Sequence, residues 1–188
     1  MEFKDKVCVV TGGSNGIGKK IIEDFIKAGS KVCFIDIDEE GAKTLTDKYK
    51  ENILYFKGDI SKEDTLKDFY KAVKENYNKI DYLINNACIS KDGITALTHA
   101  LSVSLAGKVR VNSISPGWIE TSEDAIHSNE DKNQHLVKRV GKVSDISNMV
   151  MFLCSERASF ITGQDISIDG GMTKLMIYNN DCGWNYNE

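Results

Sequence analysis

A glycine-rich turn near the start of the chain carries the clearest chemical signal in this sequence. Thr11 to Gly18 contains four glycines, follows the apolar run Val7 to Val10 and precedes a helical pattern. Glycines let a backbone approach a pyrophosphate closely, and a helix N-terminus offers unpaired N–H groups to an anion. Its place between strand and helix favours phosphate binding over the alternative, a merely structural turn. The predicted binding residues are Gly12, Ser14, Asn15, Gly16, Ile17 and Gly18.

An acidic residue stands at the end of the second apolar run, Lys31 to Ile35. Asp36 can accept both hydroxyl hydrogens of an adenosine ribose, and its charge repels a 2′-phosphate. Positions 14 and 15 of the turn are Ser and Asn, so they carry no positive charge, and no Lys or Arg directly follows Asp36. This combination predicts NAD rather than NADP, bound by Asp36 and Ile37. The alternative is that Asp36 only ends a strand, ahead of an acidic helix start.

Strands and helices alternate along the chain with short connections. Apolar runs predict strands at Lys6 to Val10, Lys31 to Ile35, Ile53 to Lys57, Ile80 to Asn85, Lys108 to Ile114 and Asp165 to Asp169. Apolar residues at intervals of three and four predict helices at 17–28, 42–49, 66–77, 94–105 and 145–155. A long, weakly patterned stretch lies at 115–140. Such alternation is typical of a parallel sheet covered by helices on both faces.

The composition is that of an ordinary globular protein. The chain has 188 residues, 41% of them apolar and 28% charged, with a net charge of −4. Because no run of Lys or Arg occurs, we expect neither a nucleic acid nor a membrane partner. The four apolar residues from Val7 to Val10 are too few for a signal peptide or a membrane span. The five cysteines show no metal-ligand spacing, which predicts a reduced, cytoplasmic protein without a metal site.

The motifs, taken in order, resemble those of the short-chain dehydrogenase/reductase family. After the glycine turn and Asp36 come Gly58-Asp59-Ile60, Asn85-Asn86-Ala87, Ser90-Lys91, Arg110 to Gly117 and Asp169-Gly170-Gly171. The resemblance implies a Rossmann-type, doubly wound parallel α/β sheet in a single dinucleotide-binding domain at 1–173. It also implies a substrate loop at about 120–140 and a C-terminal tail at 174–188. The implied activity is hydride transfer between NAD(H) and an alcohol or carbonyl substrate, and a homo-oligomer is compatible with it.

The resemblance also implies roles for individual residues. Asp59 would bond the adenine amino group with Ile60 beside it, and Asn85 and Ala87 would line the cofactor ribose. Lys91, the predicted catalytic residue, would bind the nicotinamide ribose and lower the pKa of a tyrosine proton donor. The nicotinamide and the pyrophosphate would be held by Pro116, Gly117, Ile119 and Thr121.

The chain departs from the family pattern between Ala87 and Ser90. The family tyrosine should stand four residues before Lys91, where this chain has Ala87, and the family serine should lie on a strand that this sequence lacks. An internal segment of one helix, one strand and a loop is therefore missing, which predicts a six-stranded sheet with exposed helix faces. Two interpretations remain. The protein is a family enzyme whose sequence lacks this segment, or it is a catalytically impaired NAD-binding protein.

Overall fold

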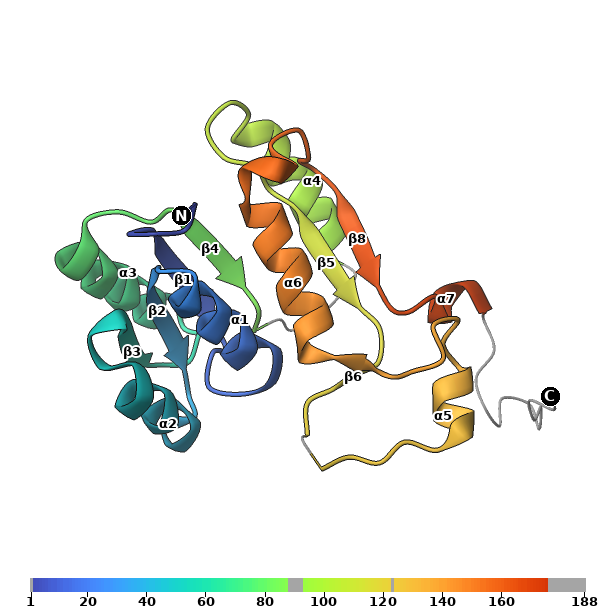
Figure 1. Ribbon diagram of the computed structural model, residues 1–188. Helices are drawn as coiled ribbons and strands as arrows, with labels where there is room; N and C mark the ends of the chain where they lie inside the picture. Colours follow the sequence, from blue (N-terminus) through green and yellow to red (C-terminus); the bar gives the residue numbers. More distant parts are fainter. Residues whose placement is uncertain (1, 88–92, 123, 176–188) are drawn as a thin grey trace. The chain divides into compact units, whose positions relative to one another are not determined.

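The computed structural model describes residues 2–87, 93–122 and 124–175 (Figure 1). The chain divides into two compact units, which are described separately. The first comprises Met1–Ile89 and Val150–Ala158, and the second comprises Ser90–Met149 and Ser159–Glu188. The single domain at 1–173 stays a prediction.

The first unit is built on a four-stranded parallel sheet. Its strand order is β3-β2-β1-β4, made of β1 (Val7–Thr11), β2 (Lys31–Asp36), β3 (Ile53–Lys57) and β4 (Tyr82–Asn85). Thr11 lies opposite Ile35 on one side and Asn85 on the other. The carboxyl ends of three strands therefore meet at one edge of the sheet, where parallel α/β sheets place their ligands.

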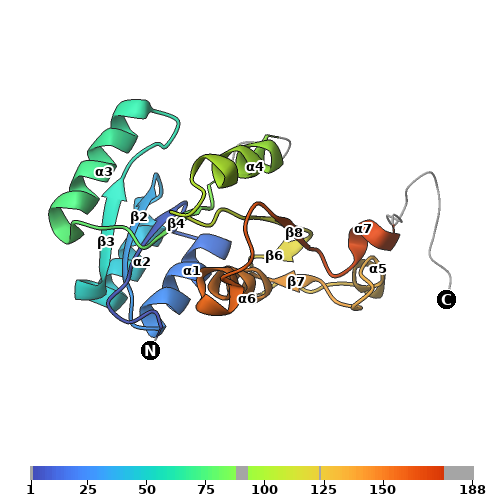
Figure 2. The same cartoon turned by 90° about the horizontal axis from the view of Figure 1, so that it is seen from above.

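Helices cover both faces of this sheet (Figure 2). They are α1 (Gly16–Lys27), α2 (Glu39–Tyr49) and α3 (Glu63–Tyr77), and a short 3₁₀ turn, η1 (Lys50–Asn52), follows α2. On one face, Phe69 and Val73 of α3 pack with the strand residues Val7, Val9, Cys33 and Ile35. The other helices bury Ile21, Ile22, Phe25, Ala42 and Leu45. These are the positions at which the sequence shows helical spacing.

Two cysteines of the sheet behave as apolar core residues. Cys8 and Cys33 are both fully buried. Burial raises the pKa of the Cys33 thiol to about 12 and that of Cys8 well above its ordinary value. Neither therefore forms a reactive thiolate near neutral pH, in agreement with their predicted role as small hydrophobic residues.

The second unit contains short strands in two pairs. The elements, in chain order, are α4 (Ile94–Ser104), β5 (Ser113–Pro116), β6 (Ile119–Glu120), α5 (Asn129–Asn133), β7 (Gly141–Lys142), β8 (Asp165–Ile168) and α7 (Met172–Leu175). β5 pairs with β8 and β6 with β7, both in parallel. Helix α6 (Val143–Cys154) has residues in both units, and η2 (Glu156–Ala158) belongs to the first. Helix α4 exposes Leu97, Leu101 and Val103, as expected for a helix without its neighbours.

The predicted six-stranded sheet is wrong. The described strands form one four-stranded and two two-stranded sheets, and β4 pairs only with β1 among them. Leu83 lies opposite Val9, on the face that α3 covers, yet Leu83 is 57% exposed and Val9 only 3%. All six predicted strands are present as β1, β2, β3, β4, β5 and β8, but β5 pairs with β8 and not with β4. The physical reason is that an apolar run predicts a strand and does not determine which neighbouring strand it pairs with.

The fifth strand also begins later than predicted, at Ser113 instead of Lys108. The preceding residues bond to a distant loop outside a strand ladder. The Val111 N–H donates to the Thr162 hydroxyl at 3.1 Å, and the Asn112 side-chain oxygen accepts from the Gln164 N–H at 3.1 Å. These partners replace the ladder bonds that the apolar pattern led us to expect.

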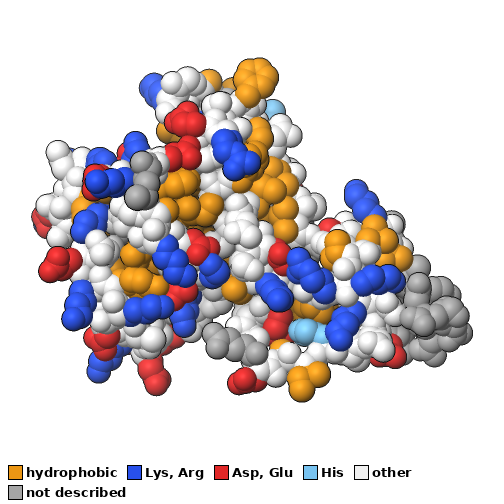
Figure 3. Space-filling view, viewed as in Figure 1, with side chains coloured by type: hydrophobic (Ala, Val, Ile, Leu, Met, Phe, Trp, Pro, Cys, Tyr) orange, Lys and Arg blue, Asp and Glu red, His pale blue; other side chains and the backbone are white. Residues whose placement is uncertain are grey.

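The surface carries both signs of charge. Lys or Arg and Asp or Glu side chains are interspersed over the face drawn in Figure 3. Among the helices of the described ranges, none combines the length and apolarity that crossing a membrane requires.

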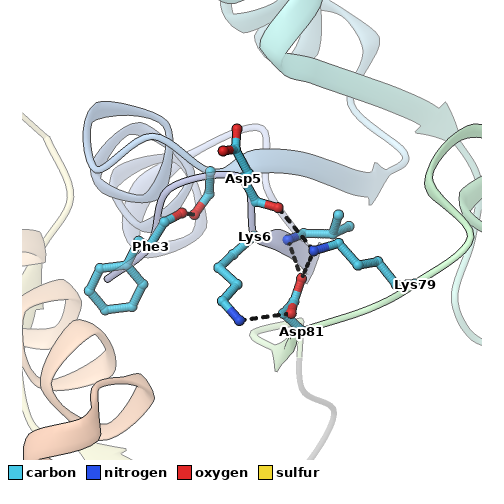
Figure 4. A network of polar contacts seen from close by, with 7 residues as sticks. Phe3, Asp5, Lys6, Lys79 and Asp81 are labelled. Atoms are coloured by element: carbon cyan, nitrogen blue, oxygen red, sulfur yellow. Dashed lines mark hydrogen bonds and ion pairs between the residues drawn. The ribbon is translucent and has the colours of Figure 1, made fainter. Parts of the chain in front are cut away.

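A network around Asp81 ties the amino ends of β1 and β4 together (Figure 4). The Asp81 carboxylate accepts from the Val7 N–H at 2.8 Å, from Lys79 Nζ at 2.9 Å and from Lys6 Nζ at 3.3 Å. Lys79 also donates to the Asp5 carbonyl at 3.0 Å. Burial alone would raise the pKa of Asp81, but its bonds to Lys79, Val7 and Lys6 hold the pKa below its ordinary value.

We predict that Asp81→Asn lowers the free energy of unfolding by about 1–3 kcal/mol at pH 7, because it weakens hydrogen bonds to a charged group. A lowered folded-state pKa stabilises the fold above the unfolded-state pKa, and this contribution disappears as the pH falls through the folded-state value. The difference between wild type and variant should therefore shrink below about pH 4. Urea denaturation at several pH values measures it. An equal loss in Asp68→Asn, at an exposed carboxylate of α3, would contradict the prediction.

Candidate cofactor site

The glycine turn has the backbone that an anion site requires. Gly12 and Gly16 adopt positive φ angles of 69° and 53°. Helix α1 begins at Gly16, and its N-cap residue, Asn15, makes no side-chain bond to the first turn of the helix. The first amide groups of α1 are therefore left for an external acceptor. This geometry fits the predicted pyrophosphate cradle.

The turn is held by backbone contacts that leave no room for side chains. A Cβ atom added to Gly18 would lie 1.9 Å from the Gly12 carbonyl oxygen. The Asn86 side chain donates to that same oxygen at 2.8 Å, and the Ala87 N–H donates to the Thr11 carbonyl at 3.1 Å. The end of β4 is thereby fastened to the turn. Asn86 belongs to the Asn85-Asn86-Ala87 motif but was not among the predicted site residues, although its position beside Asn85 was the available signal.

Asp36 joins the turn to the start of α2. One carboxylate oxygen accepts from the Ser14 N–H at 2.9 Å, and the other accepts from the Asp38 N–H at 3.0 Å. Because each carboxylate oxygen can accept two hydrogen bonds, both keep a lone pair for a ribose hydroxyl. The side chain is only half-buried, so a ligand can reach it.

Asp38 is a further residue that sequence reasoning did not assign to the site. Its carboxylate caps α2 by accepting from the Gly41 and Glu40 N–H groups, and it accepts from the Asn15 side chain at 2.6 Å. The Ser14 hydroxyl donates to its carbonyl at 2.8 Å. The Gly41 and Asn15 bonds hold the pKa of Asp38 below its ordinary value. This carboxylate therefore orients the turn, with two bonds on Oδ1 and one on Oδ2.

A hollow of about 420 Å³ opens beside the ends of β2 and β3. Its lining includes two predicted residues, Ile37 and Asp59, and Ile37 is 70% exposed. The Asp59 carboxylate accepts from the Ser61 N–H at 2.9 Å, which lowers its pKa. The remaining lining residues are Phe56, Lys57, Gly58, Lys62, Thr65 and Asp68. The hollow therefore combines two large apolar side chains, Ile37 and Phe56, with polar and charged ones that can bond the edge of a planar heterocycle.

The predicted site residues are distributed over both units. The first unit contains the turn residues, Asp36, Ile37, Asp59, Ile60, Asn85 and Ala87. The second contains Pro116, Gly117, Ile119 and Thr121 at the end of β5 and on or beside β6. Lys91 lies outside the described residues. Within the parts that the structure describes, no three His, Cys, Asp or Glu side chains are grouped as a metal site would need.

The predicted site residues of the second unit lie near the carboxyl ends of β5 and β8, where the two backbones approach each other closely. The Gly117 N–H donates to the Ile168 carbonyl at 3.0 Å. A Cβ atom added to Gly117 would lie 2.6 Å from the Cβ of Asp169. Ile119 pairs with Gly141, and Thr121 is exposed. The Pro116-Gly117 corner is thus held by backbone contacts within its own unit.

Comparisons with known proteins agree with the α/β fold and its parallel sheet. The model of the short chain dehydrogenase family matches residues 6–92, and a model described as enoyl-(acyl carrier protein) reductase matches residues 87–173. An uncharacterized oxidoreductase of Thermotoga maritima is 32% identical over 253 residues, covering 94% of this chain and 99% of its own length. A solved apo SCOR enzyme from Clostridium thermocellum is 36% identical with a TM-score of 0.85, covering 97% of this chain and 99% of its own. The 3-oxoacyl-acyl-carrier-protein reductase FabG of Chlamydia muridarum is 28% identical and covers 89% of this chain and 97% of its own length.

The chain belongs to the short-chain dehydrogenase family. It is an oxidoreductase that uses a nicotinamide cofactor and acts on a small-molecule substrate. The comparisons support this assignment and give no support to an impaired binding protein in its place.

The comparisons also bear on the predicted missing segment. The alignment with the Thermotoga maritima relative runs over 253 positions, 65 more than the 188 residues of this chain. At least that many positions are therefore occupied by the relative alone. The two family models overlap at residues 87–92, where the family pattern breaks. Both findings support a missing segment between Ala87 and Ser90, whose position remains a prediction.

We predict that Gly18→Ala disrupts the turn, because the new methyl group meets the Gly12 carbonyl. The free energy of unfolding should fall by about 1–3 kcal/mol, as for overpacking elsewhere, and nucleotide affinity should fall with it. Thermal unfolding and calorimetric titration measure the two effects. Gly93→Ala is the matched control, since a Cβ at Gly93 meets nothing within 4 Å. Equal behaviour of the two variants would contradict the role of the close approach.

Proposed function

We propose that this protein is an NAD-dependent dehydrogenase or reductase of an alcohol or carbonyl group in a small molecule. The observation that carries the proposal is the Asp36 carboxylate at the end of β2, bonded to the Ser14 N–H of the glycine turn at 2.9 Å. This links a ribose acceptor directly to a pyrophosphate cradle. When bound, the nicotinamide supplies the hydride acceptor or donor, and the protein binds and orients the reactants.

The surroundings of Asp36 favour NAD over NADP. Its negative charge would repel a 2′-phosphate. The neighbouring residues Ser14, Asn15 and Ile37 are uncharged. Of the two lysines that line the adjacent hollow, Lys57 is ion-paired with Glu39, and Lys62 interacts electrostatically with Asp59. Both cations are therefore balanced by nearby carboxylates.

The roles on the nicotinamide side are inferred from the family resemblance. Lys91 would bind the nicotinamide ribose and lower the pKa of a proton donor, and Pro116, Gly117, Ile119 and Thr121 would hold the ring and the pyrophosphate. The proton donor itself would lie in the missing segment. A positioned acid typically contributes about 10²–10⁴ in rate, so the segment matters for turnover.

Two further properties belong to the same proposal. The buried thiols Cys8 and Cys33 fit a reducing, cytoplasmic environment. The exposed Leu97, Leu101 and Val103 of α4 fit a contact with a second copy of the chain.

We predict that Asp36→Asn weakens NAD binding by about 10- to 100-fold, because a neutral amide replaces a charged acceptor of two ribose hydroxyls. The preference for NAD over NADP should fall as well, since the repulsion of a 2′-phosphate is removed. Fluorescence titration with both nucleotides measures the ratio. Asp47→Asn removes the same charge from an exposed position of α2 and should leave both affinities unchanged. Unaltered NAD affinity in Asp36→Asn would sink the cofactor assignment.

The activity is tested on protein from its natural source, after its intact mass is measured. We expect a mass several kilodaltons above the 20.9 kDa of this chain and oxidation of NADH with a panel of ketones and aldehydes. Lys91→Met should lower kcat by about 100-fold or more, since the proton donor loses its neighbouring charge. Lys43→Met, at an exposed lysine of α2, should not. A heavier protein that binds NAD but turns over no carbonyl or alcohol would overturn the proposal.

A further inference from the structure

A rigid turn of two glycines follows β8 in the second unit. Gly170 and Gly171 adopt positive φ angles of 63° and 84°. The Asp169 carboxylate holds the turn by accepting from the Gly171 N–H at 2.9 Å and from the Thr173 N–H at 3.1 Å. The bonds from Thr173 and Gly171 hold the pKa of Asp169 below its ordinary value. We call Asp169–Gly171 the anchor turn.

Consecutive residues after α5 pack directly on the anchor turn. The Val137 N–H donates to the Gly170 carbonyl at 3.2 Å. A Cβ atom added to Gly171 would lie 2.6 Å from Leu136 Cδ1, and one added to Gly170 would lie 2.8 Å from Val137 Cγ2. The contact exists because neither glycine has a side chain.

The same segment holds the ring of Trp118. His135, which is 1% exposed, lies with its ring centre 6.1 Å from that of Trp118. A second histidine, His127, also contacts Trp118, and the two rings meet edge-on with their centres 5.4 Å apart. The Nε2 atom of His127 lies 3.4 Å from a Glu120 carboxylate oxygen. Trp118 directly follows Gly117, which itself packs on Asp169. The anchor turn therefore contacts both the Pro116-Gly117 corner and the segment that places Trp118.

The anchored segment has internal order of its own. Ser128 and Asp131 form a reciprocal capping box at the start of α5. At the other end, the Gly141 N–H donates to the Trp118 carbonyl at 3.1 Å, next to the β6–β7 pair. Residues 135–137 thus lie in the chain between α5 and the β6–β7 pair, and they contact both the anchor turn and the ring of Trp118.

We propose that Gly170 and Gly171 are positioning residues that anchor the segment Ser128 to Val140 and thereby fix Trp118 beside the Pro116-Gly117 corner. This inference rests on the proposed function, in which that corner holds the nicotinamide and the following segment meets the substrate. The orientation of Trp118 then shapes the substrate side of the site. Loss of the anchor weakens substrate binding more than the chemical step, so KM rises more than kcat falls.

The test uses Trp118 as a reporter in a Trp184→Phe background, since the chain has two tryptophans. In Gly171→Ala the added methyl group meets Leu136. We expect the Trp118 emission to shift to longer wavelength and trypsin to cleave at Lys132, Lys138 or Arg139 about tenfold faster, because the segment opens locally. We also expect a higher KM for the substrate.

Gly107→Ala is the matched control. Gly107 also has a positive φ, 76°, but a Cβ there meets nothing within 4 Å. It therefore introduces the same backbone strain without the collision, and should leave emission, cleavage and KM unchanged. If Gly171→Ala behaves like Gly107→Ala, the anchoring role is overturned.

A double variant distinguishes the steric collision with Leu136 from a general loss of stability. Leu136→Gly removes every Leu136 atom that a Cβ at residue 171 would strike, including the Leu136 Cβ at 2.8 Å, so the double variant should resemble Leu136→Gly alone, and the two effects should not add. Additive effects would overturn the proposed contact.

Emission and proteolysis need no turnover, so they decide the anchor even if the proposed activity fails. If the wild type is active and Gly171→Ala loosens the segment with KM unchanged, the positioning role is overturned while the proposed function stands.

Discussion

The glycine turn of the first unit depends on a close approach between two backbone segments, Gly18 in α1 and Gly12 in the turn before it. A Cβ at Gly18 would stand 1.9 Å from the Gly12 carbonyl oxygen, so no rotamer change could relieve a larger residue. This approach brings the first amides of α1 to the carboxyl ends of the strands. Asn86 then reaches the same carbonyl from β4, and Asp36 reaches the Ser14 N–H from β2. The proposed anion site and the proposed ribose acceptor would thus depend on one local constraint.

The edge of the four-stranded sheet bears on the predicted missing segment. A parallel sheet normally has both faces covered, and an unpaired strand edge leaves N–H and C=O groups without partners. Leu83 on β4 is 57% exposed on the face that α3 covers elsewhere. The predicted missing segment, a helix and a strand after β4, is of the kind that covers such a face and pairs with such an edge. The relative of Thermotoga maritima, aligned over 253 positions, has residues enough to supply one.

Glycine serves the second unit in the same way. Gly117 approaches Asp169, and Gly170 and Gly171 approach residues 136 and 137. In each case the missing side chain lets two backbones, or a backbone and an apolar side chain, meet at a distance that alanine would forbid. The ends of the strands and the segment after α5 are therefore positioned by close steric contacts. Hydrogen bonds such as that from the Val137 N–H to the Gly170 carbonyl fix which residues lie opposite one another.

Local sequence patterns were enough to predict the helices and strands of the first unit, and they singled out the residues of the proposed cofactor site. The helices that contain Ile17, Ile21 and Phe25, and Phe69 and Val73, follow from apolar residues at intervals of three and four. Asp36 and the glycine turn are recognisable because each directly follows a continuous apolar run that predicts a strand.

Features that depend on partners far along the chain could not be predicted from local patterns. The start of β5 at Ser113 depends on residues 162–164, and the bond of Asn86 to Gly12 crosses 74 positions. The packing of His135 under Trp118 and of Leu136 on Gly171 likewise has no local pattern to announce it. The sheet broke into separate pieces for the same reason, since strand pairing depends on which strand is available as a neighbour and not on the apolar run alone.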